Sequence, residues 1–217
     1  MFGLIALLVI TAVAIRASYK LDDDTDEIPD KIASRLGKLW EIAHQGMKDN
    51  KLLRAEKALL TILKIDDKNA AAYNRLGILY AKQKEFKNAI DCFEIASSIE
   101  KSPSSYHNLG LIYYETGDYT KASIAFEEAL NLEDSMAARH IAYAKVQEKL
   151  GNNKKMIAEL EKASDLEPSK ETYLLLKRAY DLHGMDDEAK VINRKLNRTA
   201  KSTSTPKKIS RPKKVII

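Results

Sequence analysis

The stretch YNRLGILY at residues 73–80, followed by Ala89 and Phe93, decides the fold of this chain. The same residue types recur 33 residues later, as YHNLGLIY at residues 106–113 followed by Ala122 and Phe126. Six residue types at fixed offsets, found twice, predict an internal repeat made of paired helices. One such unit is too small to bury its own apolar face, so several units must stack around a shared core.

Weaker copies extend the pattern in both directions. Together with the clear copies at 70–102 and 103–136, they predict units at 36–69, 137–169 and 170–198. The weaker copies rest on apolar and small residues at the pattern positions: Leu39, Ile42, Ala43, Ala55, Leu59 and Ile62, then Tyr143, Ala144, Leu160 and Ala163, then Tyr173, Leu176, Tyr180 and Ala189. The last unit has Asn193 where the clear copies have Phe, which suits a polar terminal cap.

Small residues occupy two kinds of position in these units. Gly77, Gly110 and Ala144 fall where the two helices of a unit are expected to cross closely, so a larger side chain would push them apart. Gly117, Gly151 and Gly184 fall between the two helices, where glycine permits the positive φ that commonly ends a helix.

The pattern resembles the tetratricopeptide repeat, a helix-turn-helix unit. This resemblance implies an all-α, right-handed α-solenoid of about five repeats over residues 31–198. In that family a concave groove, lined by first-helix residues between the packing positions, receives peptides or partner segments. The resemblance thus implies a non-catalytic scaffold that binds a protein or peptide. The groove residues expected here are Trp40, His44, Asn74, Ile78, His107, Asn108, Leu111, Tyr114, Ile141, Lys145, Leu174 and Arg178.

One class of partner is disfavoured by the groove residues. Family members that bind the C-terminal carboxylate of heat-shock chaperones use Lys, Asn and Arg at set groove positions. Those positions hold Trp40, Ile78, Ala138 and Ala142 in this chain, and these side chains cannot bind a carboxylate.

No catalytic or cofactor-binding motif is found along the sequence. The four histidines are scattered without ligand spacing, and there is no Gly-rich phosphate loop or nucleophile elbow. The single cysteine, Cys92, lies beside Phe93 and is expected to be a small buried residue. We therefore expect no enzyme activity, no cofactor and no metal site in the chain alone.

Residues 1–15 are apolar except for Gly3 and Thr11, and Arg16 ends the run. We interpret 1–21 as a transmembrane signal anchor, and the acidic stretch before the first repeat, 22–30, as a linker. Arg16 and Lys20 follow the run and no cation precedes it, which places the repeats in the cytoplasm. The alternative is a cleaved signal peptide, because 12–14 reads Ala-Val-Ala, and then the repeats are exported.

The C-terminal end is strongly basic. Nine Lys or Arg and no acidic residue follow from Arg194 onward, which exceeds the net charge of +5, so the rest of the chain is net acidic. Residues 199–217 have too little apolar surface to fold and are predicted to be disordered. The charges suit an anionic lipid or a nucleic acid, and a solubilising tail is the alternative. The residues concerned are Lys207, Lys208, Arg211, Lys213 and Lys214.

Overall fold

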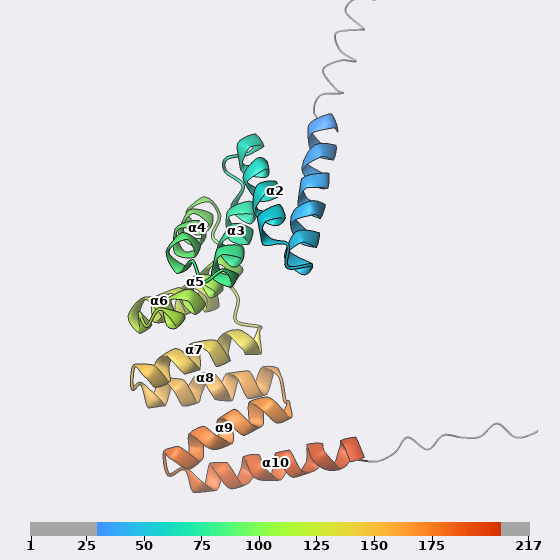
Figure 1. The fold of residues 1–217 in the computed structure, drawn as a ribbon. Helices are drawn as coiled ribbons and strands as arrows, with labels where there is room; N and C mark the ends of the chain where they lie inside the picture. The colour runs from blue at the N-terminus through green and yellow to red at the C-terminus, as the bar shows by residue number, and fades with distance from the viewer. Residues whose placement is uncertain (1–29, 205–217) are drawn as a thin grey trace, which may run out of the picture. The chain divides into compact units, whose positions relative to one another are not determined.

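A computed structural model describes residues 30–204, with side chains to Arg198. Within this part every regular element is an α-helix and no strand is present, which confirms the predicted all-α class (Figure 1). The chain divides at Ile99 and Glu100 into two compact units, described separately below. The interpreted anchor, nearly all of the acidic linker, and the five tail cations lie outside the described residues. Between residues 30 and 204 no helix is long and apolar enough to cross a bilayer.

Unit 1 contains two helical hairpins, and we call the first helix of each hairpin the A helix and the second the B helix. The first A helix covers residues 30–48 and is followed by α2 (Leu52–Ile65). The second hairpin consists of α3 (Ala70–Lys82) and α4 (Phe86–Ile99). The core of unit 1 joins both hairpins, because α2 packs on α3 and buried side chains such as Leu59, Ile62 and Leu76 form one cluster.

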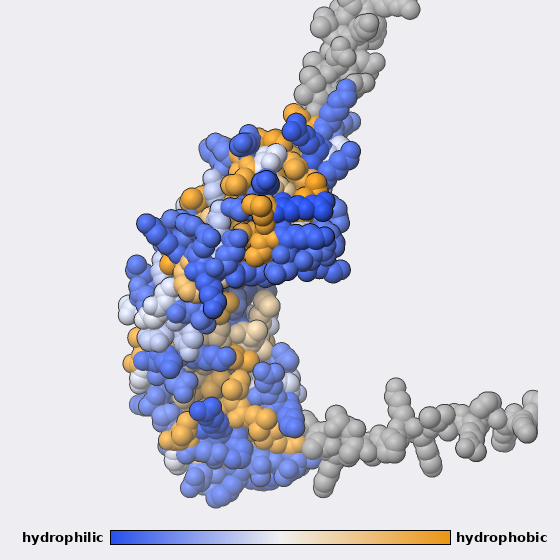
Figure 2. All heavy atoms as spheres, in the orientation of Figure 1, coloured by the Kyte–Doolittle hydropathy of each residue, from blue (hydrophilic) through white to orange (hydrophobic). Residues whose placement is uncertain are grey.

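Unit 2 contains three hairpins. The first two are α5 (Pro103–Glu115) with α6 (Tyr119–Leu132), and α7 (Ala137–Lys149) with α8 (Asn153–Leu166). The third is α9 (Lys170–Leu182) with α10 (Asp186–Ser204). Each B helix packs on the next A helix, α6 on α7 and α8 on α9, so the hairpins stack within the unit. Hydrophilic residues dominate the visible surface of both units, with hydrophobic residues gathered in patches (Figure 2).

Close helix crossings explain the glycines of the repeated motif. A Cβ added at Gly77 would lie 2.6 Å from the nearest ring atom of Phe93, and one at Gly110 would lie 2.9 Å from the ring of Phe126. Both values are too short for carbon–carbon contact, so each glycine is required by the phenylalanine opposite it. The predicted packing role of these glycines is confirmed.

The same two positions change size together in the other repeats. The first and fourth repeats pair an alanine with a leucine, Ala43 with Leu59 and Ala144 with Leu160, and all four side chains are buried. The fifth repeat pairs Lys177 with Asn193. In the two buried pairs a larger side chain on the A helix is therefore matched by a smaller one on the B helix, as close packing requires, whereas Asn193 of the fifth pair is exposed.

The turn inside every hairpin contains a residue with positive φ, two positions before the B helix begins. Three of these residues are glycines, with φ of 82° at Gly117, 74° at Gly151 and 68° at Gly184, as the sequence predicts. In unit 1 the position is held by Asn50, with φ of 58°, and by Lys84, with φ of 62°. The turn geometry is thus common to all five hairpins, although only three of them use glycine.

Candidate functional site

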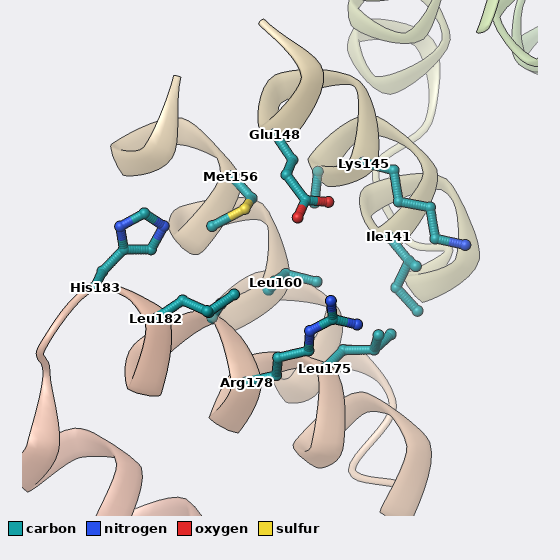
Figure 3. Close-up of a pocket in the computed structure, with 11 residues that line it drawn as sticks. Ile141, Lys145, Glu148, Met156, Leu160, Leu175, Arg178, Leu182 and His183 are labelled. Atoms are coloured by element: carbon teal, nitrogen blue, oxygen red, sulfur yellow. The ribbon is translucent and has the colours of Figure 1, made fainter. Parts of the chain in front are cut away.

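The clearest pocket on the A helices of unit 2 lies between α7 and α9, with α8 beneath it (Figure 3). It encloses about 140 Å³. Its walls are largely apolar: Ile141, Ala144, Met156, Leu160, Leu175, Ala179 and Leu182. Cofactors and drug-sized ligands usually occupy ~300–1,000 Å³. A pocket of this size is better suited to one apolar side chain of a partner.

Charged side chains surround this apolar pocket. Lys145 and Glu148 come from α7, and Arg178 comes from α9. Figure 3 shows Glu148 and Arg178 pointing toward one another across the opening. Lys145 and Arg178 are exposed, and neither forms an ion pair with another described side chain. The pocket therefore offers two cations to a ligand and one carboxylate at its edge.

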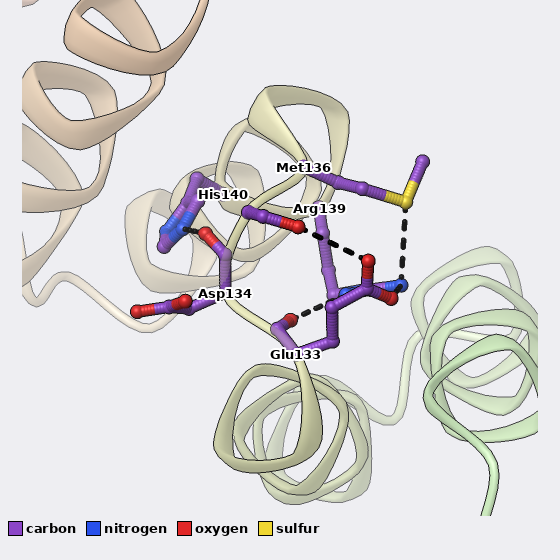
Figure 4. A network of polar contacts seen from close by, with 6 residues as sticks. Glu133, Asp134, Met136, Arg139 and His140 are labelled. Carbon is purple, nitrogen blue, oxygen red and sulfur yellow. Dashed lines mark hydrogen bonds and ion pairs between the residues drawn. The ribbon is translucent and has the colours of Figure 1, made fainter.

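A polar network next to this pocket holds α7 in place, and Figure 4 shows its contacts between the start of α7 and the preceding loop. His140 Nδ1 lies 2.6 Å from Glu159 Oε2 on α8, and its Nε2 lies 2.8 Å from the backbone oxygen of Asp134. Arg139 donates to the backbone oxygen of Glu133 and, at 3.2 Å, to its carboxylate. These bonds tie the start of α7 to α8 and to the preceding loop, and so fix the A-helix face that carries Ile141 and Lys145.

A second groove occurs in unit 1, between the 30–48 helix and α3. It encloses about 240 Å³ and is lined by Trp40, Glu41, His44 and Met47 together with Arg75 of α3. Two of the predicted groove residues, Trp40 and His44, thus lie together here. Their neighbours Glu41 and Arg75 give this groove one charge of each sign.

The predicted groove residues are all at least partly exposed, but they differ in what they contact. In unit 1, Asn74 is half-buried, and Ile78 is half-buried and packs against the core. In unit 2, Ile141 also packs against the core while lining the pocket. The remaining members outside the pocket are half-buried or exposed: His107, Asn108, Leu111, Tyr114 and Leu174.

His107 is positioned more by packing than by the open groove. Its ring meets Phe126 edge to face, with centroids 5.4 Å apart and planes at 71°. Burial, followed by the positive charge of Arg139, lowers the pKa of His107 below its usual value. The imidazole is therefore neutral at physiological pH and contributes no charge to ligand binding. Tyr114 likewise packs against Tyr119, with ring centroids 5.5 Å apart.

Several lining residues were missed by reasoning from the sequence. The pocket takes Leu175 and Leu182 from α9, and not Leu174. The groove of unit 1 takes Arg75, which lies inside the repeated motif itself. Helical spacing would have found Leu182, because it lies one turn beyond Arg178. Nothing in the sequence distinguishes Leu174 from Leu175.

Metal binding and thiol chemistry find little support in the described residues. No group of three or more His, Cys, Asp or Glu side chains between residues 30 and 198 is arranged to hold a metal ion. Burial raises the pKa of the Cys92 thiol to about 11, so it is protonated and unreactive at neutral pH.

Family comparison agrees with this architecture. Residues 68–135 and 138–170 each match a family model described as tetratricopeptide repeat. Over these residues the chain is similar to tetratricopeptide repeats. The matches cover the second to fourth hairpins. No curated protein matches the sequence.

Solved structures with tetratricopeptide repeats have a similar fold. A crystal structure of MamA is 20% identical and aligns over 81% of this chain and 98% of its own, with a TM-score of 0.69. A MamA structure from Desulfovibrio magneticus RS-1 is 14% identical over 79% of this chain and 98% of its own, with a TM-score of 0.68. YrrB, described as a TPR protein with an unusual peptide-binding site, is 18% identical and aligns over 71% of this chain and 80% of its own, with a TM-score of 0.60. At these identities the likeness shows the fold alone.

Proposed function

We propose that this chain is a non-catalytic protein-interaction module, and that the pocket between α7 and α9 binds one apolar side chain of a partner segment. The observation that carries the proposal is the composition of this pocket. Its floor is apolar, its volume of about 140 Å³ suits a side chain, and two cations that pair with no other described side chain stand at its opening. YrrB, a protein of similar fold, has a peptide-binding site, which is consistent with this use of the fold.

The charges at the opening favour one kind of partner segment. Lys145 and Arg178 attract a carboxylate, and Arg presents a planar fork that can bind one through two hydrogen bonds. Glu148 disfavours a second carboxylate on its own side of the pocket. We therefore expect a partner segment in which an acidic residue accompanies the apolar residue that enters the pocket.

The test compares two charge-reversal variants of the full-length chain in pull-downs from a detergent extract. The pocket variant is K145E with R178E, and the matched control is K154E with K162E, which makes the same charge change on exposed residues of α8. We expect the pocket variant to lose partners that the wild type and the control both retain. Identical partner profiles for all three proteins would refute the pocket as the binding site.

We also propose that residues 1–21 tether the module to a membrane, with the repeats on the cytoplasmic side. The support is the sequence alone: an apolar run at residues 1–15, followed by Arg16 and Lys20. Protease treatment of intact and of permeabilised cells, with sequencing of the mature N-terminus, tests this proposal. A cleaved N-terminus, or digestion of the repeats in intact cells, would contradict it.

A further inference from the structure

The first hairpin has an open face that the later hairpins do not have. Ile42 occupies the position held by Leu76, Leu109, Tyr143 and Leu176 in the other repeats, as the spacing to the following B helix shows. Those four side chains are buried, whereas Ile42 is only half-buried. In unit 2 a preceding B helix covers the A helix at this face, α6 on α7 and α8 on α9. No described helix precedes the 30–48 helix to cover it.

This open face forms a groove between the 30–48 helix and α2, which we call the N-terminal groove. It encloses about 670 Å³. Its apolar residues are Leu39, Ile42, Leu52, Leu53 and Ala58. Leu53 is 63% exposed, so its side chain is available to a partner. Since helices cover the equivalent faces elsewhere in the chain, a helix is the shape that fits here.

Positive charge borders the N-terminal groove on both sides. Lys51, just before α2, and Arg54 and Lys57 of α2 line it, and no carboxylate is found among its described lining residues. Arg35 and Lys38 are exposed on the other helix and share a face with Ile42, at spacings of three and four residues. Only Lys51 is paired, with Asp49 at 3.5 Å; Arg54 and Lys57 form no ion pair with another described side chain. The N-terminal groove has an apolar floor and cationic edges, so a complementary partner helix has an apolar stripe with acidic residues on both sides.

We propose that the N-terminal groove binds an acidic amphipathic helix of another protein. A second copy of this chain fits poorly, because stacking its last helix here would bring Arg194, Lys195 and Arg198 against the cationic edges. The chain's own N-terminal sequence supplies this pattern only in part. Residues 1–15 contain no carboxylate, and the acidic run at 22–27 contains no apolar side chain, which leaves only Leu21 and Ile28 at its two ends. This surface is separate from the pocket between α7 and α9.

The probe is a synthetic amphipathic helical peptide with Leu at every third or fourth position and Glu on both flanks. A matched peptide carries Lys in place of each Glu. Binding of the labelled peptides to the full-length chain in a non-ionic detergent is followed by fluorescence anisotropy. We expect the acidic peptide to bind about tenfold tighter than the basic one, with an affinity that falls as salt rises.

Four variants decide the proposal. R54E with K57E should weaken the acidic peptide about tenfold and reverse the preference toward the basic peptide. L53Q should weaken both peptides about tenfold, since it removes apolar contact. K154E with K162E makes the same charge change on exposed residues of α8, which line neither surface, and should leave binding unchanged. Circular dichroism and urea midpoints show that each variant is folded, and the milder pair R54Q with K57Q should give an intermediate affinity.

Other occupants would appear as distinct results, each of which overturns the proposal. Binding of either peptide that R54E with K57E does not alter would exclude the N-terminal groove as the site. Binding to anionic vesicles that requires Arg54 and Lys57, without binding of the acidic peptide, would indicate a lipid surface. Self-association that L53Q abolishes in sedimentation, again without peptide binding, would indicate a second copy.

Discussion

Replacing Gly77 by alanine should destabilise the chain unless Phe93 is replaced as well. The added Cβ would lie 2.6–2.8 Å from three ring atoms of Phe93, about 1 Å inside normal carbon–carbon contact. Overpacking of this kind costs about 1–3 kcal/mol, and the better helix propensity of alanine offsets about 1 kcal/mol of it. With a cost from the middle of this range, about 2 kcal/mol, we expect G77A to lower the free energy of unfolding by about 1 kcal/mol. F93L alone should cost about 1 kcal/mol through lost contact and a small cavity.

The double variant G77A with F93L tests the size matching directly, because the first and fourth repeats already pair alanine with leucine at this crossing. In G77A with F93L the new methyl group occupies space that the ring has left, so the two costs should not add. We expect a favourable coupling energy of about 1–2 kcal/mol from a double-mutant cycle.

Urea unfolding of the four proteins, followed by circular dichroism, measures this cycle. The control is G37A, since nothing lies within 4 Å of a Cβ added at Gly37. That change should be neutral or stabilise the chain by up to about 1 kcal/mol. A cycle in which the two costs simply add, or a G77A variant as stable as the wild type, would refute the size-matching argument.

Three further changes test features of the hairpins. K84G should raise the free energy of unfolding by about 0.5–1 kcal/mol, because Lys84 has a φ of 62° that glycine adopts without strain; an unchanged urea midpoint would contradict this. Burial and the hydrogen bond to Glu56 raise the pKa of Tyr80 to about 12, so its contribution to stability is complete below pH 10 and is lost as the pH rises to 12. The stability of Y80F, from urea unfolding at each pH, should therefore fall less than that of the wild type over this interval. E159A should cost about 3 kcal/mol, because it leaves the buried ring of His140 without its partner on α8, and E159Q should cost less; equal losses would argue against the bond.

The sequence predicted those features that recur at fixed positions of the repeat pattern. Gly77 and Gly110 lie against the phenylalanines that the pattern pairs with them, and Gly117, Gly151 and Gly184 have positive φ. Each of these predictions needed only the local backbone and the period of 33 residues. The repeats therefore gave the hairpins, their turns and their crossings.

Features that the repeat pattern does not mark were not predictable in the same way. The partners His140 and Glu159 are 19 residues apart on α7 and α8, and no repeated spacing marks the pair. Lys84 adopts positive φ because the surrounding hairpin imposes it, against the preference of lysine. The pocket takes Leu175 and not Leu174, a difference of about 100° around one helix. Such a rotation depends on the packing of the whole hairpin, so sequence spacing alone does not resolve it.

The paired sizes at the helix crossings also bear on how such a chain can be recombined. Exchanging α4 for α8 would set Leu160 against Gly77 and leave an empty space, and the reverse exchange would force Phe93 onto Ala144. Exchanging complete hairpins keeps every glycine with its phenylalanine and every alanine with its leucine. Gene duplication, or the design of a chimera, can thus join segments of two such chains between a B helix and the next A helix. A junction in the turn inside a hairpin would instead separate the paired residues.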